Sequence, residues 1–211
     1  MREIDLENWP RRAHYEMFRK MAFPHFSLTT IVELSNFYQY LKKQELSFTI
    51  GMMYLLAKTA NQIPEFRCRI RDETVIEHDI IHPSCTILTD DNLFAFCSVR
   101  FSEDFQDFAA LAAERIALVK TDPTLDDSDW ADSLLFMTSL PWISFTSMHH
   151  PNSSTTDSVP RVAWGKYLIE ADTIRMPLNI QAHHGLIDGL HVGQFFGQFQ
   201  AYLDDPEKVL I

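Results

Sequence analysis

The sequence predicts an α+β fold in which a mixed sheet is covered by helices. Segments with strand character and segments with helical periodicity are interspersed, without the strict alternation that a doubly wound α/β fold requires. The 211 residues are 46% hydrophobic and 12% aromatic, which is enough apolar surface for one large core. No stretch has the composition of a linker and no internal repeat is present, so we expect a single domain over residues 1–211.

The first expected helix begins near Pro10, because Pro is tolerated in a first helical turn and Ala13, Met17 and Phe18 fall on one side. A strand over residues 30–34 precedes a helix over 34–43. A stronger helix over 49–62 carries apolar residues at helical spacing and ends before Pro64.

Short runs of β-branched and aromatic residues predict the strands of the sheet. They cover residues 66–70, 74–77, 85–88, 93–101, 134–139, 142–147, 162–169 and 174–182. The last run alternates most clearly, with an apolar side chain at every second position from Met176 to Ala182.

Two further helices have an apolar stripe on one side, over residues 105–120 and 190–203. The stripe of the second helix includes Val192, Phe195, Phe199 and Leu203. Two polar segments, 120–130 and 148–159, contain Pro and turn-forming residues and are expected to be surface loops.

Composition also limits the kinds of partner. The chain has 18 Lys and Arg against 29 Asp and Glu, a formal charge of -11, and no basic block, which argues against nucleic acid or an anionic membrane. The three cysteines are an odd number without CxxC spacing, so we expect a reduced, cytoplasmic setting. No apolar segment is long enough for a signal peptide or a membrane span.

The segment Gln181–Val192 carries the clearest chemistry, because an apolar strand leads into two adjacent histidines and then a turn. Neighbouring residues on a strand point to opposite faces, so His183 and His184 are not expected to share one pocket. One should react and the other should be structural. Gly185 would allow an unusual backbone angle after them, and Asp188 could orient the turn by charge-assisted hydrogen bonds.

Three interpretations of this segment remain open from the residues alone. A histidine could act as a general base on a hydroxyl or thiol acceptor. Alternatively His184, Asp188 and His191, spaced i, i+4 and i+7, could bind a metal from one helical face, although Gly189 weakens a continuous helix there. In the third interpretation the histidines are ordinary core or surface residues.

The motif H-H-x-x-x-D-G at residues 183–189 resembles the signature of the chloramphenicol acetyltransferase family, and other motifs of that family follow in the correct order. They are Ile4-Asp5 with Trp9 to Tyr15, Phe26-Ser27-Leu28-Thr29, Leu140-Pro141-Trp142 with Phe145, and Gly165-Lys166-Tyr167. Other coenzyme A acyltransferases share the histidine motif, but they are much longer. The resemblance implies a two-layer sandwich with a mostly antiparallel sheet.

The resemblance implies an acetyl-CoA-dependent O-acetyltransferase that transfers the acetyl group directly in a ternary complex. His184 is then the general base, with its ring held by a hydrogen bond to its own backbone, and Asp188 pairs with Arg11. Thr138 takes the position of a serine whose hydroxyl stabilises the oxyanion. A further family hydroxyl is missing at Ala163.

Binding residues follow from the same resemblance. The acceptor pocket corresponds to Met17, Phe18, Ala22, Phe94 and Phe96, and its altered walls put the acceptor in doubt, although chloramphenicol or a related compound is expected. The His149-His150 pair falls on a loop near this pocket. Coenzyme A is expected near Trp142, Lys166 and Tyr167, and no metal is expected.

Family members are homotrimers with active sites at subunit interfaces, and the name of the family links them to antibiotic resistance. We therefore expect a homotrimer. The alternative is a divergent member that binds coenzyme A or a small ligand without acetylating chloramphenicol, as the changes at Thr138 and Ala163 allow.

Overall fold

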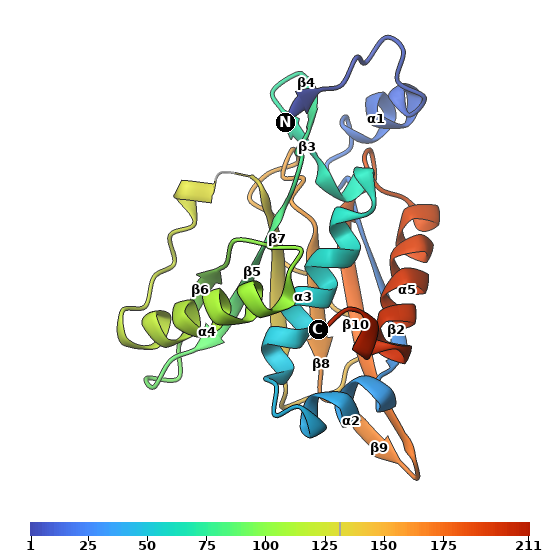
Figure 1. Ribbon diagram of the computed structural model, residues 1–211. Helices are drawn as coiled ribbons and strands as arrows, with labels where there is room; N and C mark the ends of the chain where they lie inside the picture. Colours follow the sequence, from blue (N-terminus) through green and yellow to red (C-terminus); the bar gives the residue numbers. More distant parts are fainter. Residues whose placement is uncertain (131) are drawn as a thin grey trace.

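Helices and strands are interspersed along the chain, as Figure 1 shows for a computed structural model that describes residues 1–130 and 132–211. The α-helices are α1 (Arg12–Phe18), α2 (Ser35–Lys43), α3 (Phe48–Asn61), α4 (Phe105–Thr121) and α5 (Gly189–Asp204). The strands are β1 (Arg2–Glu3), β2 (His25–Glu33), β3 (Cys68–Arg71), β4 (Thr74–Glu77), β5 (His82–Leu88), β6 (Phe94–Ser98), β7 (Leu134–Leu140), β8 (Arg161–Gly165), β9 (Leu168–Glu170) and β10 (Thr173–His183). Short 3-10 helices are η1 (Pro64–Arg67), η2 (Ser128–Trp130) and η3 (Pro206–Lys208).

The main sheet has seven strands in the order β2-β10-β8-β7-β5-β6, with β9 paired to the start of β10. The β5–β7 and β7–β8 pairs are parallel and the others are antiparallel. A second, three-stranded sheet has the order β1-β4-β3 and is antiparallel. The fold is therefore the α+β class that the sequence predicts.

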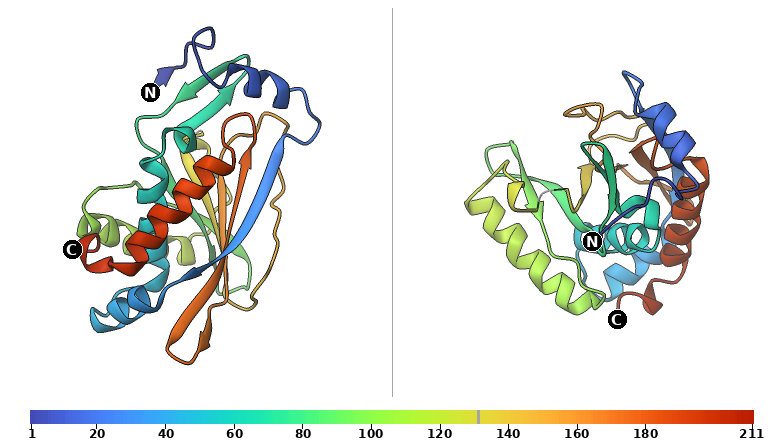
Figure 2. Two further views of the ribbon diagram at one scale, coloured as in Figure 1. Left: turned by 90° about the vertical axis from the view of Figure 1, so that its right-hand side faces the viewer. Right: turned by 90° about the horizontal axis from the view of Figure 1, so that it is seen from above.

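Helices α2 to α5 lie on one face of the main sheet, and the segment that follows β7 crosses the other face (Figure 2). Strand β10 shows why the faces differ. Leu178, Ile180 and Ala182 are buried in the core on the helical side, whereas Asn179 and Gln181 alternate with them and bond to the loop on the opposite side.

The starts of the long helices are set by their capping residues. Ser47, Asp104 and Asp188 each accept a hydrogen bond from a backbone N–H in the first turn, at α3, α4 and α5 respectively.

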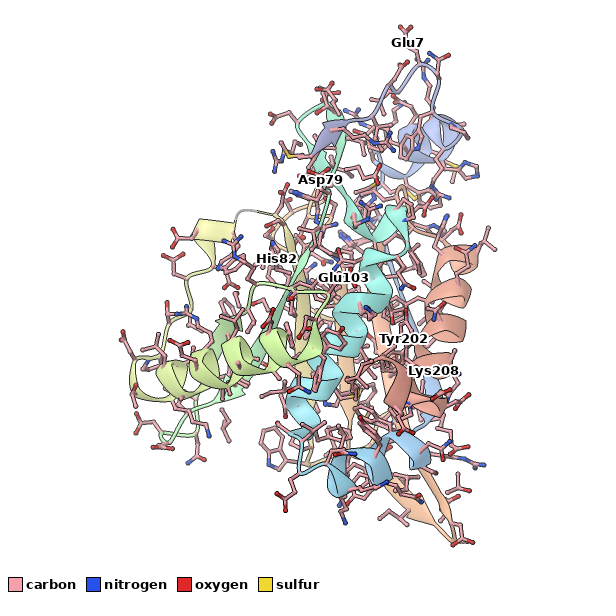
Figure 3. The ribbon with its side chains drawn as sticks, in the orientation of Figure 1. Glu7, Asp79, His82, Glu103, Tyr202 and Lys208 are labelled. Atoms are coloured by element: carbon pink, nitrogen blue, oxygen red, sulfur yellow. The ribbon has the colours of Figure 1, made fainter. Side chains whose placement is uncertain are left out.

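Figure 3 shows where the side chains of the ends and the middle of the chain lie. His82, at the start of β5, is close to the middle of the molecule, whereas Tyr202 and Lys208 mark the C-terminal region. None of the helices in residues 1–130 and 132–211 is long and apolar enough to cross a membrane.

Strands β5 and β7 pair only along part of their length. Their register runs from His82 opposite Leu134 to Cys85 opposite Met137, whereas β5 continues beside β6 as far as Leu88. Figure 1 shows β5, β6 and α4 turning away from β7 beyond this point. At the start of β5 the sheet is therefore continuous from β6 to β7, whereas at the end of β5 a gap separates β5 from β7.

The predicted strand over residues 142–147 is wrong. Pro141 and Trp142 form a turn at the end of β7, and the following residues have no strand partner. Trp142 and Ile143 are 61% and 56% exposed, so their apolar character does not reflect burial within one chain. Strand propensity needs a neighbouring strand to be realised.

Other boundaries also differ from the prediction. The run 162–169 is broken into β8 and β9 around Lys166, and residues 66 and 67 belong to η1. Strand β2 begins at His25, well before the predicted position 30, because β10 extends far enough to pair with it as far as His183. Strand β6 ends at Ser98.

Candidate active site

The two adjacent histidines at the end of β10 have different surroundings. His183 is 1% exposed, and its Nδ1 accepts a hydrogen bond of 3.1 Å from the Gly185 N–H. Burial, assisted by the neighbouring His25, lowers the pKa of His183 to about 4. This ring is therefore neutral and held in place.

His184 lies just beyond the strand and is half-buried between two aromatic rings. The Phe18 ring stacks on it with centroids 4.1 Å apart, and the Phe26 ring lies 4.6 Å away. Its backbone N–H donates to the Pro24 carbonyl at 2.8 Å. The imidazole is therefore fixed by stacking from β2 and α1.

The hydrogen bond from the His184 ring to its own backbone is not present. Its Nδ1 atom is buried and has no hydrogen-bond partner among the described residues. The His184 carbonyl instead lies 3.4 Å from Nη2 of Arg11. Stacking, rather than an intraresidue hydrogen bond, orients this ring.

Gly185 is needed for close packing and not for an unusual backbone angle. None of the glycines in the described ranges has a positive φ, which corrects the sequence-based expectation. A Cβ atom at residue 185 would lie 3.0 Å from Cε1 and 3.1 Å from Nδ1 of His183. The glycine therefore lets the turn pass directly over the His183 ring.

Asp188 ties the turn to the amino-terminal helix. Its Oδ2 lies 2.5 Å from Nη1 of Arg11, and its Oδ1 accepts from the Leu190 N–H at 2.9 Å. Partial burial would raise the pKa of the Asp188 carboxyl, but these donors outweigh it and lower the pKa to about 2. The carboxylate is charged and links α1 to the start of α5.

His191 completes the cap of α5. Its Nδ1 accepts a hydrogen bond of 3.1 Å from the Asp188 N–H, which closes a capping box. In the part of the chain that the structure describes, no three His, Cys, Asp or Glu side chains gather in a metal-binding arrangement. The surroundings of His184 and His191 thus favour separate roles.

A cavity of about 810 Å³ opens where β5 and β7 part. One wall comes from β5, β6 and α4, and the other from β7, the turn at Pro141 and the start of α3. Ser84, Phe136 and Arg161 line it at its closed end, where the strands still pair as neighbours. The size suits a small-molecule ligand.

Some of the residues singled out in the sequence line this cavity. They are Thr138, Trp142, Phe94 and Phe96. Thr138 lies at the point of parting and is paired in register with Ala163. Phe96 is half-buried, and its ring centroid is 6.0 Å from that of Phe94.

Another set lies outside the cavity. Of the residues that the structure describes, those lining the cavity do not include His184, Asp188, Arg11, Met17, Phe18, Ala22, Lys166 or Tyr167. Phe18 contacts His184, while Met17 and Ala22 are exposed on and after α1. A single chain thus separates the histidine cluster, defined here as His184, Phe18, Phe26, Arg11 and Asp188, from the cavity.

Lys166 and Tyr167 lie beyond the end of β8. The Lys166 N–H donates to the Ile143 carbonyl at 2.7 Å, which links Lys166 to the turn that carries Trp142. Tyr167 packs against Tyr38 and Phe48, and its side chain is half-buried. Lys166 itself is exposed.

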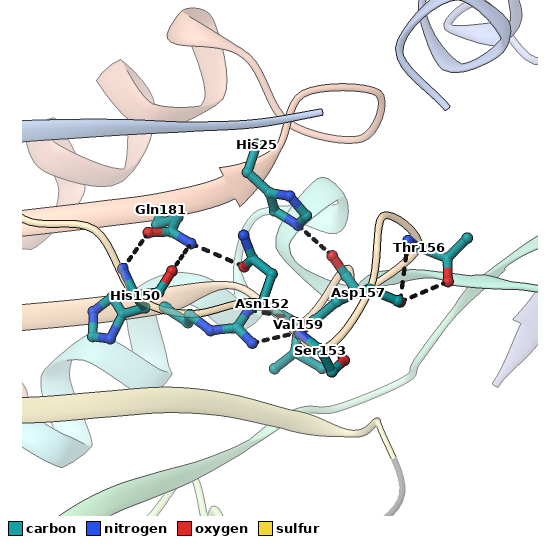
Figure 4. Close-up of polar contacts among 10 residues, drawn as sticks. His25, His150, Asn152, Ser153, Thr156, Asp157, Val159 and Gln181 are labelled. Atoms are coloured by element: carbon teal, nitrogen blue, oxygen red, sulfur yellow. Dashed lines mark hydrogen bonds and ion pairs between the residues drawn. The ribbon is translucent and has the colours of Figure 1, made fainter. Parts of the chain in front are cut away.

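The loop over residues 148–157 is held to the sheet by Gln181, a residue that sequence reasoning did not single out. Its Oε1 accepts from the His150 N–H at 2.7 Å, and its Nε2 donates to the His150 carbonyl at 3.1 Å and to Asn152 (Figure 4). His150 thereby lines the cavity. Burial, with nearby Arg161, lowers the pKa of His150 to about 4.

A second set that sequence reasoning missed lies at the closed end of the cavity. Ser84 and Ser98 face each other across β5 and β6, with their Oγ atoms 2.9 Å apart. Their hydroxyls reach Asp127, at 3.0 Å from Ser84 and 2.5 Å from Ser98. No local pattern in the sequence points to this set, because Ser84 and Ser98 lie on different strands and Asp127 comes from the distant 120–130 loop.

Comparison with known proteins shows which family the sequence matches. A family model described as chloramphenicol acetyltransferase matches residues 1–200. Chloramphenicol acetyltransferase 3 of Escherichia coli is 30% identical over 209 residues, covering 98% of each chain. A chloramphenicol acetyltransferase of Klebsiella sp is 28% identical over 205 residues, covering 96% of this chain and 93% of the relative.

Solved structures agree with the sequence comparisons. A chloramphenicol acetyltransferase structure matches with a TM-score of 0.84 and 27% identity, over 96% of this chain and 100% of the other. The dihydrolipoamide acetyltransferase of Azotobacter vinelandii matches with a TM-score of 0.72 over 94% and 88% of the two chains. Its identity of 15% indicates a shared fold alone.

Proposed function

The chain belongs to the chloramphenicol acetyltransferase family and is an acyltransferase, and we propose that it transfers acetyl from acetyl-CoA to a hydroxyl group of a small acceptor. Chloramphenicol or a related compound is the proposed acceptor. The observation that carries the proposal is His184, an imidazole stacked on Phe18 at the end of β10. It needs no serine or cysteine nucleophile to act as a base.

In the proposed reaction His184 takes the proton of the acceptor hydroxyl through Nε2. The acceptor oxygen attacks the thioester carbonyl carbon, a C–O bond forms, and the carbonyl oxygen becomes an oxyanion that accepts a hydrogen bond from the Thr138 hydroxyl. The C–S bond then breaks, and the thiolate of coenzyme A takes the proton from His184. Protons and electrons balance without a cofactor beyond the two substrates.

Positioning and binding residues are proposed for each part of this reaction. Arg11 and Asp188 hold the turn that carries His184, Phe18 stacks on the base, and Met17, Phe18 and Ala22 are proposed to contact the acceptor. Phe94 and Phe96 line the acceptor side of the cavity. Trp142 lies at the cavity wall, and its link through Ile143 to Lys166 and Tyr167 supports coenzyme A binding along this edge.

We further propose a homotrimer in which His184 of one subunit faces the cavity of the next. Two observations support it: His184 does not line the cavity of its own chain, and several large apolar side chains are more than half exposed. Among them are Met17, Phe23, Ile31, Trp142 and Ile143. Such a surface is typical of an interface.

A thiol-release assay with acetyl-CoA and a panel of hydroxylated molecules, chloramphenicol among them, tests the activity. We expect His184→Ala to lose turnover, whereas His149→Ala, at an exposed histidine in the loop after β7, retains it. Unchanged turnover in His184→Ala would refute the role of the base. A panel without turnover, combined with a melting shift from coenzyme A or chloramphenicol, would favour the alternative of a binding protein.

Subunit mixing tests the interfacial site. Thr138→Val and His184→Ala subunits each lack one half of the proposed site. Refolding an equal mixture should restore about a quarter of the wild-type sites, because one interface combination in four unites both intact halves. No recovery in mixed trimers, or an active monomer in light scattering, would rule out the interfacial arrangement.

A further inference from the structure

The closed end of the cavity contains a hydroxyl pair backed by a carboxylate. Ser84 and Ser98 are both 3% exposed, and Ser84 lines the cavity. Behind them, Asp127 lies within hydrogen-bond distance of both hydroxyls. Among the ion pairs of residues 1–130 and 132–211, none involves Asp127.

The proton arrangement decides what this end of the cavity can bind. Each serine has one hydroxyl hydrogen, and a carboxylate only accepts hydrogen bonds. Ser84 donates its hydrogen to Oδ2 of Asp127, and the shorter contact of Ser98 is to Oδ1. The Ser84 oxygen therefore has no hydrogen left for a ligand and can only accept.

Arg161, on the other side of the closed end of the cavity, does not neutralise the Asp127 carboxylate. Arg161 also lines the cavity, but both of its terminal nitrogens bond to Asp157, and its guanidinium lies 5.3 Å from the centre of the Phe136 ring. Its charge is thus paired locally. A ligand group that reaches Ser84 meets an acceptor oxygen with a carboxylate behind it.

The position of Ser84 relative to Thr138 sets a length. Ser84 is paired with Phe136, and Thr138 lies two residues further along β7. Two residues along a strand and one strand across give a separation of about 8 Å between the two Cα atoms. This is the span of a substituted aromatic ring, which suits the phenylalanine-lined walls between the two points.

We propose that the natural acceptor carries a second hydrogen-bond donor, a hydroxyl or amino group, about 8 Å from the hydroxyl that is acetylated, and that Ser84 binds this donor. The inference rests on the proposed acetyltransferase function and narrows its acceptor to an aromatic or cyclic alcohol with a polar, donating far end. An acceptor-only group such as a nitro group is disfavoured, because it places oxygen lone pairs against the Ser84 oxygen.

A matched pair of acceptors tests this directly. The pair is chloramphenicol, with its aromatic nitro group, and the analogue in which that group is reduced to an amine. We expect the wild type to prefer the amine about tenfold in kcat/KM, which corresponds to one net hydrogen bond. The Ser84→Ala variant should lose this preference and Asp127→Asn should weaken it, whereas Ser139→Ala, another cavity hydroxyl, should retain it.

Binding of the two compounds to the His184→Ala protein, measured by calorimetry with coenzyme A present, separates this inference from the proposed function. If the His184→Ala protein binds the amine more tightly and the wild type turns over neither compound, the proposed acetyltransferase function is refuted. Recognition of the donor by Ser84 is then still supported. Equal turnover of both compounds, or a preference that persists in Ser84→Ala, overturns the inference. So does the absence of binding by either compound, provided circular dichroism shows folded protein.

Discussion

Breaking the Arg11–Asp188 ion pair should loosen the turn that carries His184. The pair joins residues 177 positions apart, Arg11 in front of α1 and Asp188 in front of α5. Their side chains are 14% and 29% exposed. Replacing Arg11 by Met keeps much of the side-chain volume, removes the charge, and leaves Asp188 with the Leu190 N–H as a donor.

The size of the effect follows from the pKa of Asp188. A pKa near 2 in place of 3.8 corresponds to about 2 kcal/mol in favour of the folded state at neutral pH. Solvent screens a carboxylate that is 29% exposed, and Leu190 supplies part of the shift, so the share of Arg11 is about 1 kcal/mol. Because the pKa is lowered by folding, this stability is fully present above pH 3.8 and is lost as the pH falls through about 2.

Urea unfolding at fixed protein concentration measures this loss for Arg11→Met, Asp188→Asn and the double variant. We expect a coupling free energy of about 1 kcal/mol at pH 7, smaller at pH 3, and a drop in kcat that exceeds any change in KM. Arg12→Met is the control, because Arg12 is adjacent, exposed and outside the ion pairs of the described residues. Coupling within error of zero, or an equal effect of Arg12→Met, would refute the reasoning.

Three further predictions concern other parts of the molecule. Gly185→Ala should destabilise the protein by about 1–3 kcal/mol and lower kcat, since its Cβ would crowd the His183 ring; a stability equal to wild type in urea would contradict this. Stability should fall as the pH drops from about 6.5 to 4, because burial lowers the pKa values of His82, His150 and His183 to about 4 and the unfolded chain binds more protons; a flat urea midpoint over this range would oppose it. Phe96→Ala should widen the cavity and move kcat/KM towards bulkier acceptors by about 1–3 kcal/mol, and an unchanged acceptor ranking would argue against a contact role.

The periodicity of apolar residues was sufficient to predict those helices and strands that bury one face in the core of the same chain. Alternation along β10 predicts which residues face the helices, and the apolar stripe of α5 is buried as expected at Val192, Phe195 and Phe199. The segment 142–147 has similar composition but no strand beside it. Its exposed Trp142 and Ile143 show that an apolar run indicates burial somewhere, including against another chain, and not necessarily in a sheet.

The candidate site divides in the same way. The sequence predicts different surroundings for His183 and His184, and the structure has them: His183 is buried at the end of β10, whereas His184 lies just beyond the strand and is half-buried. The contact between Arg11 and Asp188 depends on the whole chain and was available only through the family resemblance. The Ser84, Ser98 and Asp127 set had neither source, since it combines two strands with a loop through side-chain hydrogen bonds alone.

Gln181 holds the 148–157 loop in a way that allows the residues lining the proposed acceptor pocket to change. Its amide forms hydrogen bonds with the backbone N–H and C=O of residue 150, as a neighbouring strand would. These bonds do not involve the side chain at that position. The imidazole that lines the cavity can therefore be exchanged for another group while the loop stays attached. Residue 150 is thus a position where acceptor preference can evolve, or be redesigned, separately from the stability of the fold.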